Sequence, residues 1–315
     1  MKEWLTNENP LGLFRNSELF LTDIDPKPWS GHFNYLATIG EKQFVLRFKG
    51  PEWGTQKGII DEYNTLEAIN EYAVGPQVYY LSNDFFGEPM MLQEYLPGTI
   101  LSEFSAADQK EWFPKVADLI AKINAIPITR LPVKFQKISY IPDVDAWHER
   151  MEVILRDPVG QDFGLQIQKL LPKAEHMVTG FEKRLRHIIH EVGPVYIFES
   201  SHIGHCLVTN GGVRFINWEP VSSGDPSYTL AVFLASIYTR PDFEEVKEIM
   251  IRRYLTQREV PEFAELVEQR LKERQISDFT WLVWMRVTRG NASALYEDPN
   301  IAGRLVRVKQ LLGCG

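Results

Sequence analysis

The sequence has little cysteine: two residues in 315, Cys206 and Cys314. Two cysteines cannot form the disulfide framework of a small secreted protein, so each is expected to be a free thiol in a reducing compartment. No uninterrupted apolar stretch is long enough to span a bilayer, and the amino-terminal stretch Met1–Pro10 lacks the apolar run of a signal peptide. We therefore expect a cytoplasmic protein with no membrane partner.

Basic residues are the minority charge. Forty-two acidic residues outnumber thirty-four basic ones, which gives a formal net charge of −8. No block of lysine and arginine forms a stripe that would neutralise nucleic acid phosphates, so nucleic acid is not an expected partner. Apolar residues are plentiful instead: they make up 44% of the chain, with 12 tyrosines, 18 phenylalanines and 8 tryptophans, enough to fill the cores of two domains.

The first third of the chain has the pattern of a sheet with one helix. Alternating apolar and polar residues between about 17 and 50 predict an antiparallel hairpin with strands at Tyr35–Ile39 and Phe44–Phe48. Two further apolar runs, at residues 77–81 and 90–96, flank a turn-like stretch and predict a second hairpin. Between the hairpins, apolar residues recur at helical spacing from 58 to 69.

The rest of the chain is expected to be mostly α-helical. Trp112, Val116, Leu119 and Ile123 recur on one helical face, and the same spacing is found farther on. Further helices are predicted from about 143 to 157, 162 to 191, 242 to 255, 260 to 274, 278 to 289 and 299 to 312.

The most informative stretch is Phe198–Leu207, which is followed by Phe215–Glu219 and by Gly224–Tyr228. These segments read Glu-Ser-Ser-His-Ile-Gly-His, then Ile-Asn-Trp-Glu, then Gly-Asp-Pro. They resemble the signature of the aminoglycoside phosphotransferase and choline kinase family, His-Gly-Asp-x-His-x-x-Asn, then Ile-Asp-Trp-Glu, then Gly-Asp-Pro. The resemblance extends from about residue 15 to about residue 305, and His202 and Gly204 keep their family residues.

The resemblance implies a two-lobed, protein-kinase-like α+β fold. Residues 1–96 would form the amino-terminal, nucleotide-binding type of lobe, an antiparallel sheet plus a helix. Residues 97–315 would form a helical lobe that carries the altered motifs and the wall that selects the phosphate acceptor. A nucleotide such as ATP, or a small metabolite, would bind in the cleft between the lobes.

Three working positions of the family carry other residues here. The catalytic aspartate falls on Ser200, the metal-binding asparagine on His205 and the metal-binding aspartate on Asn217. Serine is not a base near neutral pH, and a general base contributes about 10²- to 10⁴-fold in rate. Magnesium prefers oxygen ligands in octahedral geometry, which an imidazole and a neutral amide supply poorly. Magnesium affinity should fall steeply, so magnesium is in doubt as a cofactor.

The resemblance also assigns residues that contact the nucleotide phosphates. Arg47 stands where the family has a strand lysine or arginine, and Lys49 lies two residues on, on the same strand face, so either is a candidate. Glu62 would pair with that cation, although a solvent-exposed glutamate is the alternative. The loop at residues 28–34 takes the place of the phosphate-covering loop, although its single glycine is equally typical of an ordinary turn.

The second hairpin ends at Pro97–Gly98, where the family has the hinge between its lobes. Backbone groups near Gln93, Glu94 and Tyr95 would bond to an adenine there, and Leu46 and its neighbours would cover the ring. A plain strand that ends in a turn is the competing interpretation.

Two other kinds of site are weaker. His202, His205 and Cys206, with Glu199 or Glu219, have side chains suited to zinc, but His202 is already explained as the retained family histidine. Ser200 beside a histidine resembles a nucleophilic serine, but the spacing establishes neither a positioned base nor an oxyanion hole.

Three functional hypotheses follow. In the first, the chain is a pseudoenzyme that binds a nucleotide or small metabolite, or regulates a protein partner. Replacing two carboxylates by neutral residues removes repulsion toward phosphate, so metal-free nucleotide binding is expected. In the second, it is an active phosphotransferase acting on a hydroxyl acceptor, with Asp225 or Glu219 compensating. In the third, it uses the fold for other chemistry, such as nucleotidyl transfer.

Overall fold

The structure, a computed structural model, describes residues 1–14, 18–24, 31–50, 56–136, 138 and 144–314. The chain divides into two compact units. Unit 1 comprises Met1–Lys137, Val195–Ser223 and Glu244–Arg258, and unit 2 comprises Ile138–Pro194, Gly224–Phe243 and Glu259–Gly315. Unit 1 therefore joins the amino-terminal region to the segment that carries Ser200, His205 and Asn217. The boundary expected after residue 96 is not where these units divide, and it stays a prediction.

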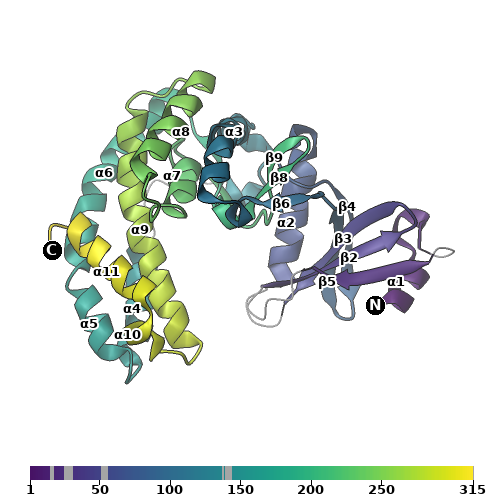
Figure 1. Ribbon diagram of the computed structural model, residues 1–315, viewed down its shortest axis with the longest axis horizontal. Helices are drawn as coiled ribbons and strands as arrows, with labels where there is room; N and C mark the ends of the chain where they lie inside the picture. Colours follow the sequence, from purple (N-terminus) through teal and green to yellow (C-terminus); the bar gives the residue numbers. More distant parts are fainter. Residues whose placement is uncertain (15–17, 25–30, 51–55, 137, 139–143, 315) are drawn as a thin grey trace. The chain divides into compact units, whose positions relative to one another are not determined.

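The amino-terminal part of unit 1 is an antiparallel sheet of strand order β1-β2-β3-β5-β4, with α2 beside it (Figure 1). Both predicted hairpins are confirmed, because β2 pairs with β3 and β4 pairs with β5. The elements are β1 (Leu19–Asp23), β2 (His32–Ile39), β3 (Lys42–Lys49), α2 (Gln56–Ile69), β4 (Val78–Phe85) and β5 (Glu88–Glu94).

The two faces of this sheet have different roles. On one face Leu46, Leu19 and Phe44 pack with Leu5 of α1 (Lys2–Glu8) and with Phe14. Strand residues alternate between faces, so Arg47 lies on the opposite face, which α2 adjoins. The expectation that Leu46 covers an adenine beside the strand cation is therefore wrong, because Leu46 is fully buried in the other cluster.

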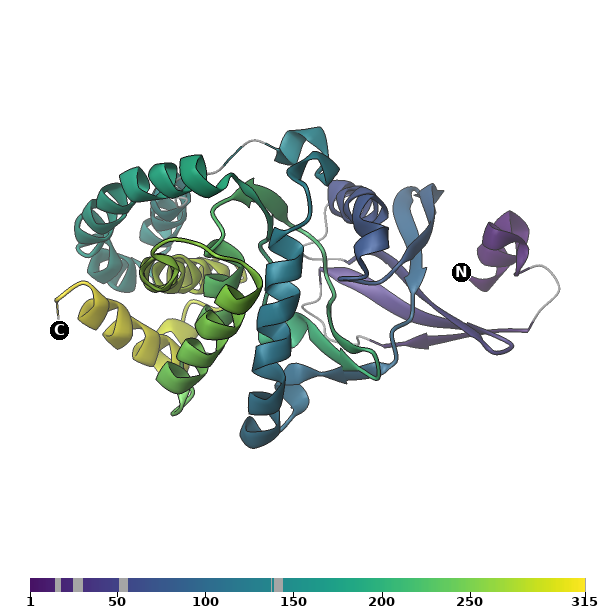
Figure 2. The ribbon, with the colours of Figure 1, turned by 90° about the horizontal axis from the view of Figure 1, so that it is seen from above.

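The remainder of unit 1 packs around α3 (Ala106–Asn124). This helix begins where Ser105 Oγ accepts a hydrogen bond from the Asp108 N–H at 3.2 Å, as an N-cap does. It lies alongside a small sheet of order β6-β8-β9, in both views (Figures 1 and 2). The other elements are β6 (Gly98–Ile100), β7 (Val195–Phe198), β8 (Cys206–Thr209), β9 (Gly212–Phe215), β10 (Val221–Gly224) and α8 (Phe243–Gln257).

Unit 2 is built from helices, and α9 (Phe263–Thr288) packs against α4, α6, α7, α10 and α11. Two helices were expected where α9 is continuous; no glycine or proline interrupts it, and Ile276 and Ser277 at the expected break are buried. One helix was expected where the chain forms α5 and α6. The helix is divided because Pro172, which lacks the N–H that a helix interior needs, lies in the first turn of α6. The remaining elements are α4 (Val144–Arg156), α5 (Gln161–Gln168), α6 (Leu171–Val192), α7 (Tyr228–Ala235), α10 (Ala294–Glu297) and α11 (Pro299–Leu311).

Neither long apolar helices nor disulfides contribute to this fold. In the part of the chain that is described, no helix is long and apolar enough to cross a bilayer. Both cysteines are free thiols, as expected: Cys206 is buried and Cys314 is partly exposed.

Candidate functional site

Arg47 lies at the centre of a polar cluster in unit 1. Its Nε donates to Glu62 Oε2 at 2.8 Å, and Nη1 donates to Asn34 Oδ1 at 2.9 Å. Its Nη2 lies 3.0 Å from His32 Nδ1 and also donates to Asn217 Oδ1. These contacts use four of the five N–H donors of a guanidinium. Of the acceptors, only Glu62 carries a negative charge.

The strand register explains how the cluster forms. Asn34 on β2 stands opposite Arg47 on β3, and His32 lies two residues before Asn34, on the same face. Between the two predicted cations, Arg47 is the one that pairs with Glu62. Lys49 also lies on this face, but its Nζ is 3.7 Å from Glu88 Oε1 and remains about one-third exposed.

Glu62 joins α2 and β3 to the loop after β9. Its Oε2 accepts from Arg47, and its Oε1 accepts from the backbone N–H of Trp218 at 2.8 Å. The side chain is 1% exposed, so the alternative of a solvent-exposed glutamate is wrong. A carboxylate can accept several hydrogen bonds at once, which is why one residue holds both partners.

Trp218 is fully buried and anchors the same loop. Its ring stacks on Phe198 with centroids 4.5 Å apart, and its Nε1 donates to the carbonyl of Phe215 at 2.8 Å. A Cβ at Gly75 would lie 2.3 Å from Trp218 Nε1, so only glycine fits there. The packing of this indole therefore fixes the backbone position of the preceding residue, Asn217.

Asn217 has a backbone φ of 64°, in the left-handed region. Asparagine enters that region more readily than most residues. This conformation presents the amide oxygen to Arg47. Sequence reasoning treated Asn217 only as a lost metal ligand and did not foresee this bond, although an asparagine just after a strand is a signal for such a turn.

The histidine motif is used to shape the backbone. His202 Nδ1 accepts from the N–H of Gly204 at 2.9 Å and caps the short turn Ile203–His205. His205 Nδ1 lies 2.9 Å from the carbonyl of Ser200, and because a carbonyl only accepts, that nitrogen carries the hydrogen. Burial lowers the pKa of His205 below 6.5. The hydrogen bond to Ser200 opposes this shift, the Arg47 charge adds to it, and the Glu62 charge opposes it. The ring is therefore neutral.

Ser200 has no geometry for a nucleophile or a base. Its Oγ donates to the backbone carbonyl of Glu219 at 2.6 Å. His205 bonds to the backbone carbonyl of Ser200 and not to its hydroxyl. Nothing in this arrangement supports the nucleophilic serine hypothesis.

The residues at the replaced positions do not fit a magnesium ion. The Asn217 oxygen accepts from Arg47, the Ser200 hydroxyl acts as a donor, and His205 offers a nitrogen. Within the described ranges, no group of three or more histidine, cysteine, aspartate or glutamate side chains could hold a metal. Zinc is unsupported for the same reason, and burial raises the pKa of the Cys206 thiol to about 12.

Glu219 is the carboxylate of this loop that remains partly exposed. Burial raises its pKa above the ordinary 4.5, and the charges of Glu62 and Asp61 raise it further. Its side chain lies over α2, where a Cβ at Gly58 would come within 2.4 Å of Glu219 Oε2. Small size at Gly58 therefore makes room for this carboxylate.

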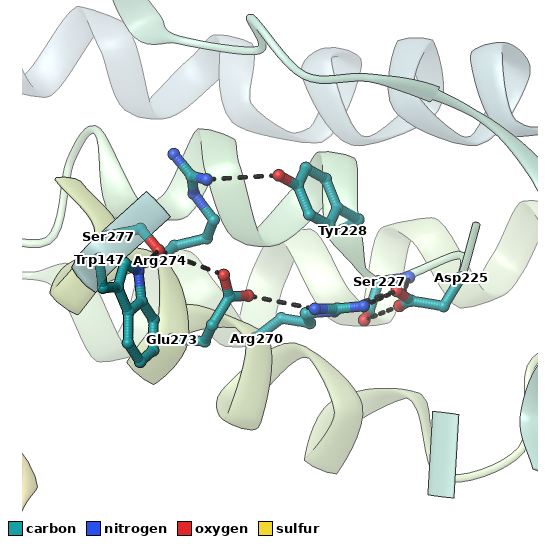
Figure 3. A network of polar contacts seen from close by, with 8 residues as sticks. All are labelled: Trp147, Asp225, Ser227, Tyr228, Arg270, Glu273, Arg274 and Ser277. Atoms are coloured by element: carbon teal, nitrogen blue, oxygen red, sulfur yellow. Dashed lines mark hydrogen bonds and ion pairs between the residues drawn. The ribbon is translucent and has the colours of Figure 1, made fainter. Parts of the chain in front are cut away.

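Asp225, the second carboxylate considered as a compensating group, is fully buried in unit 2. Its Oδ2 accepts from Nε and Nη2 of Arg270, at 3.0 and 2.8 Å, and its Oδ1 accepts from the N–H of Ser227 at 3.0 Å (Figure 3). Arg270 also pairs with Glu273 at 3.2 Å. The carboxylate of Asp225 is therefore committed to a structural ion pair.

The segment expected to contact adenine follows β5. The N–H of Glu94 donates to the carbonyl of Gln77 at 2.7 Å, which removes one of the expected donors. Gln93 is buried, and its Oε1 has no hydrogen-bond partner among the described residues. Gln93 and Tyr95 thus remain the better candidates for contacts with an adenine ring. Residues 28–30 of the expected phosphate-covering loop lie outside the described residues.

His32 gives the cluster a testable pH dependence. Arg47 can only donate, so His32 Nδ1 accepts and the ring is neutral. Burial, and then the Arg47 charge, lower the pKa of His32 from 6.5 to about 3. Below pH 6.5 the His32 ring takes up a proton in the unfolded chain but stays neutral in the folded chain. The free energy of unfolding should therefore decrease by about 1.4 kcal/mol for each unit that the pH falls between 6.5 and about 3.

Urea unfolding of the wild type and of His32→Gln at about pH 8 and about pH 5 would measure this dependence. The variant should lose most of the dependence between these values. His187→Gln, at an exposed position on α6, is the matched control and should keep it. An equal slope in the wild type and His32→Gln would show that His32 ionises normally.

Comparisons with known proteins identify the family and the fold. The sequence profile of the phosphotransferase enzyme family, APH, matches residues 26–266. The chain belongs to the phosphotransferase enzyme family. No curated protein sequence matches this family member.

Solved structures resemble this phosphotransferase-family chain over nearly its whole length. A thermostable mutant of aminoglycoside phosphotransferase APH(4)-Ia, in a ternary complex with ADP and hygromycin B, is 14% identical with a TM-score of 0.69, covering 100% of this chain and 98% of that one. Choline kinase from Cryptosporidium parvum Iowa II is 14% identical with a TM-score of 0.68, covering 99% of each chain. Choline kinase LicA from Streptococcus pneumoniae is 16% identical with a TM-score of 0.65, again covering 99% of each. These likenesses confirm the predicted protein-kinase-like α+β fold.

Proposed function

We propose that this phosphotransferase-family chain is a catalytically impaired relative that binds a nucleotide, or another phosphorylated small molecule, beside Arg47 without magnesium. The observation that carries the proposal is the bond from the Arg47 guanidinium to Asn217, at the position where the family has a metal-binding aspartate. Phosphoryl transfer needs a carboxylate that orients the acceptor and oxygen ligands for magnesium. Ser200 is not a carboxylate, and the side-chain oxygen of Asn217 accepts a hydrogen bond from Arg47.

A phosphate group would improve the contacts of Arg47. Three of its present acceptors, His32, Asn34 and Asn217, are neutral. A guanidinium and an anionic phosphate attract each other as opposite charges and can form two parallel hydrogen bonds, which a single neutral acceptor does not offer. A bound phosphate would therefore displace one or more neutral acceptors, while Glu62 continues to hold Nε. The guanidinium would supply the positive charge that magnesium supplies in an active kinase.

Support for the nucleotide comes from the related structures and from the strand end. The similar aminoglycoside phosphotransferase structure is a complex with ADP. In this chain the buried amide of Gln93 and the backbone of Tyr95, directly after β5, are the groups proposed to contact a base.

Calorimetric titration with ATP, with and without magnesium, tests the proposal. The wild type should bind, and magnesium should change the dissociation constant by less than about twofold, since no magnesium ligand is gained. The double variant Arg47→Met/Glu62→Gln removes both charges of the pair and should weaken binding by at least about tenfold. Lys49→Met is the control, because Lys49 pairs with Glu88 outside the cluster. The triple variant Ser200→Asp/His205→Asn/Asn217→Asp should acquire a dependence on magnesium.

The opposite results would favour the other hypotheses. Tight, magnesium-dependent binding by the wild type would indicate an active phosphotransferase, with Glu219 as its partly exposed carboxylate. Label transfer from the α-phosphate and not from the γ-phosphate would indicate nucleotidyl transfer. No binding of ATP under either condition would refute the nucleotide proposal.

A further inference from the structure

Unit 2 carries a surface cluster of arginine and tyrosine residues that shares no residue with the Arg47 cluster, and of its members only Tyr228 belongs to a signature segment, Gly224–Tyr228. The residues come from three helical segments, and α9 packs against both α7 and α11, which brings the segments together. All are partly exposed. We call it the arginine-tyrosine surface: Tyr228 on α7, Tyr238 after it, Arg274 and Asp278 on α9, and Arg304 and Arg307 on α11.

Arg274 connects one side of this surface. Its Nη1 donates to the hydroxyl of Tyr228 at 3.3 Å, and its guanidinium carbon lies 5.8 Å from the centroid of that ring. Its Nη2 donates to Asp278 Oδ1 at 2.6 Å. Figure 3 shows Arg274 directed toward Tyr228, whereas Arg270 is directed toward Asp225. The two neighbouring arginines of α9 thus serve different environments, one buried and one at the surface.

Tyr238 connects the other side. The guanidinium carbon of Arg304 lies 5.3 Å from the centroid of the Tyr238 ring. Burial raises the pKa of Tyr238, Arg304 and Arg307 lower it, and Asp278 raises it, so these three charges all act on one phenol. Among the residues that the structure describes, Arg307 makes one long hydrogen bond, from Nε to Gln275 Oε1 at 3.4 Å. Gln275 directly follows Arg274 on α9, so this bond brings Arg307 of α11 next to that part of α9.

The balance of charge on this surface is positive. Three guanidinium groups, of Arg274, Arg304 and Arg307, meet one carboxylate, of Asp278. The buried Arg270 pairs with the carboxylates of Asp225 and Glu273. With these three residues included, four guanidinium groups face three carboxylates. Among the residues named here, arginines therefore outnumber carboxylates in both counts, in a chain whose formal net charge is −8.

We infer that the arginine-tyrosine surface binds a small organic anion that carries carboxylate or phosphate groups. Arginine offers planar N–H pairs that match the oxygens of either group, and partial burial strengthens such bonds relative to bulk water. Arg304 and Arg274 are oriented by the rings of Tyr238 and Tyr228, which reduces the loss of side-chain entropy on binding. The same excess of positive charge disfavours a cationic ligand such as choline.

Calorimetric titration of the full chain with citrate, inorganic phosphate and choline chloride tests this inference. Citrate or phosphate should bind and choline should not, and the stronger of the two anions identifies the group that is preferred. Arg307→Gln and Arg304→Gln should each weaken binding by about tenfold, the effect of losing one charge-assisted hydrogen bond. Arg156→Gln makes the same change in net charge at an exposed position on α4 and should have no effect.

Several results would overturn the inference. It fails if neither anion binds the wild type more tightly than about 1 mM, or if folded Arg304→Gln and Arg307→Gln bind as the wild type does. An equal loss in Arg156→Gln would show a general charge effect only. Binding that is lost in Arg47→Met/Glu62→Gln and kept in the α11 variants would place the anion at Arg47 instead. The inference thus stands or falls separately from the proposed nucleotide binding.

Discussion

Replacing Arg270 by methionine is expected to lower the free energy of unfolding by about 3–5 kcal/mol. Methionine is apolar and fills much of the same space, so the loss comes mainly from charge. Asp225 and Glu273, both at most 2% exposed, would be left in the interior without their cation. Burial already raises the pKa of Glu273, and losing Arg270 would raise it further. The loss should therefore be smaller at acidic pH, where the Glu273 carboxyl is protonated and carries no charge.

Arg184→Met is the matched control for this experiment. Arg184 also pairs with two carboxylates of unit 2, Glu262 and Glu265, but these are 52% and 65% exposed. Pairs exposed to water contribute no more than about 1 kcal/mol, so the control should change little. Chemical unfolding measures both variants. The double variant Arg270→Met/Asp225→Asn should recover part of the loss, and equal losses for Arg184→Met and Arg270→Met would contradict the role given to burial.

Replacing Glu62 by alanine should lower the free energy of unfolding by a similar amount, about 3–5 kcal/mol. Arg47, with its side chain 8% exposed, would lose the one anionic acceptor that it has among the described residues, and the N–H of Trp218 would lose its partner. An unsatisfied buried N–H alone costs about 1–3 kcal/mol. Urea unfolding, followed by tryptophan fluorescence, measures the change.

Two further variants separate the causes. Glu67→Ala lies on the same helix, where Glu67 is exposed and accepts only from Tyr63, so it should cost little. The double variant Arg47→Met/Glu62→Gln removes both charges and should be more stable than Glu62→Ala, because no unpaired charge stays buried. If Glu62→Ala unfolds at the same urea concentration as Glu67→Ala, the cluster does not hold unit 1 together.

Local patterns predicted much of the fold because they depend on neighbouring residues. The alternation of residues 35–48 gave the correct hairpin, and the motif around Ser200 and Gly224 indicated the kinase-like architecture. The errors concern the face of a strand on which a residue lies and the ends of helices. Leu46 was assigned to the wrong face, although it directly precedes Arg47 in the strand and must therefore lie on the opposite face. Pro172 divides a helix that apolar spacing alone makes continuous.

The candidate site was predictable only in part. The pairing of Arg47 with Glu62 follows from the family pattern and is present. The bond from Arg47 to Asn217 joins residues 170 positions apart and depends on a left-handed backbone at Asn217. The bond from the Ser200 hydroxyl to the Glu219 carbonyl likewise depends on how two loops meet. The residue types at these positions showed which family residues are replaced, but not which contacts the replacing side chains make.

The double role of Glu62 bears on how such sequences diverge. Because its carboxylate holds both a strand arginine and a loop N–H, selection for a stable protein would preserve it even in a relative that is no longer selected for phosphoryl transfer. Descendants of this chain should therefore retain Arg47 and Glu62 while Ser200 and His205 drift. Across such a lineage, an invariant strand arginine and helix glutamate would record ancestry and foldability, and would be no guide to which members are still enzymes.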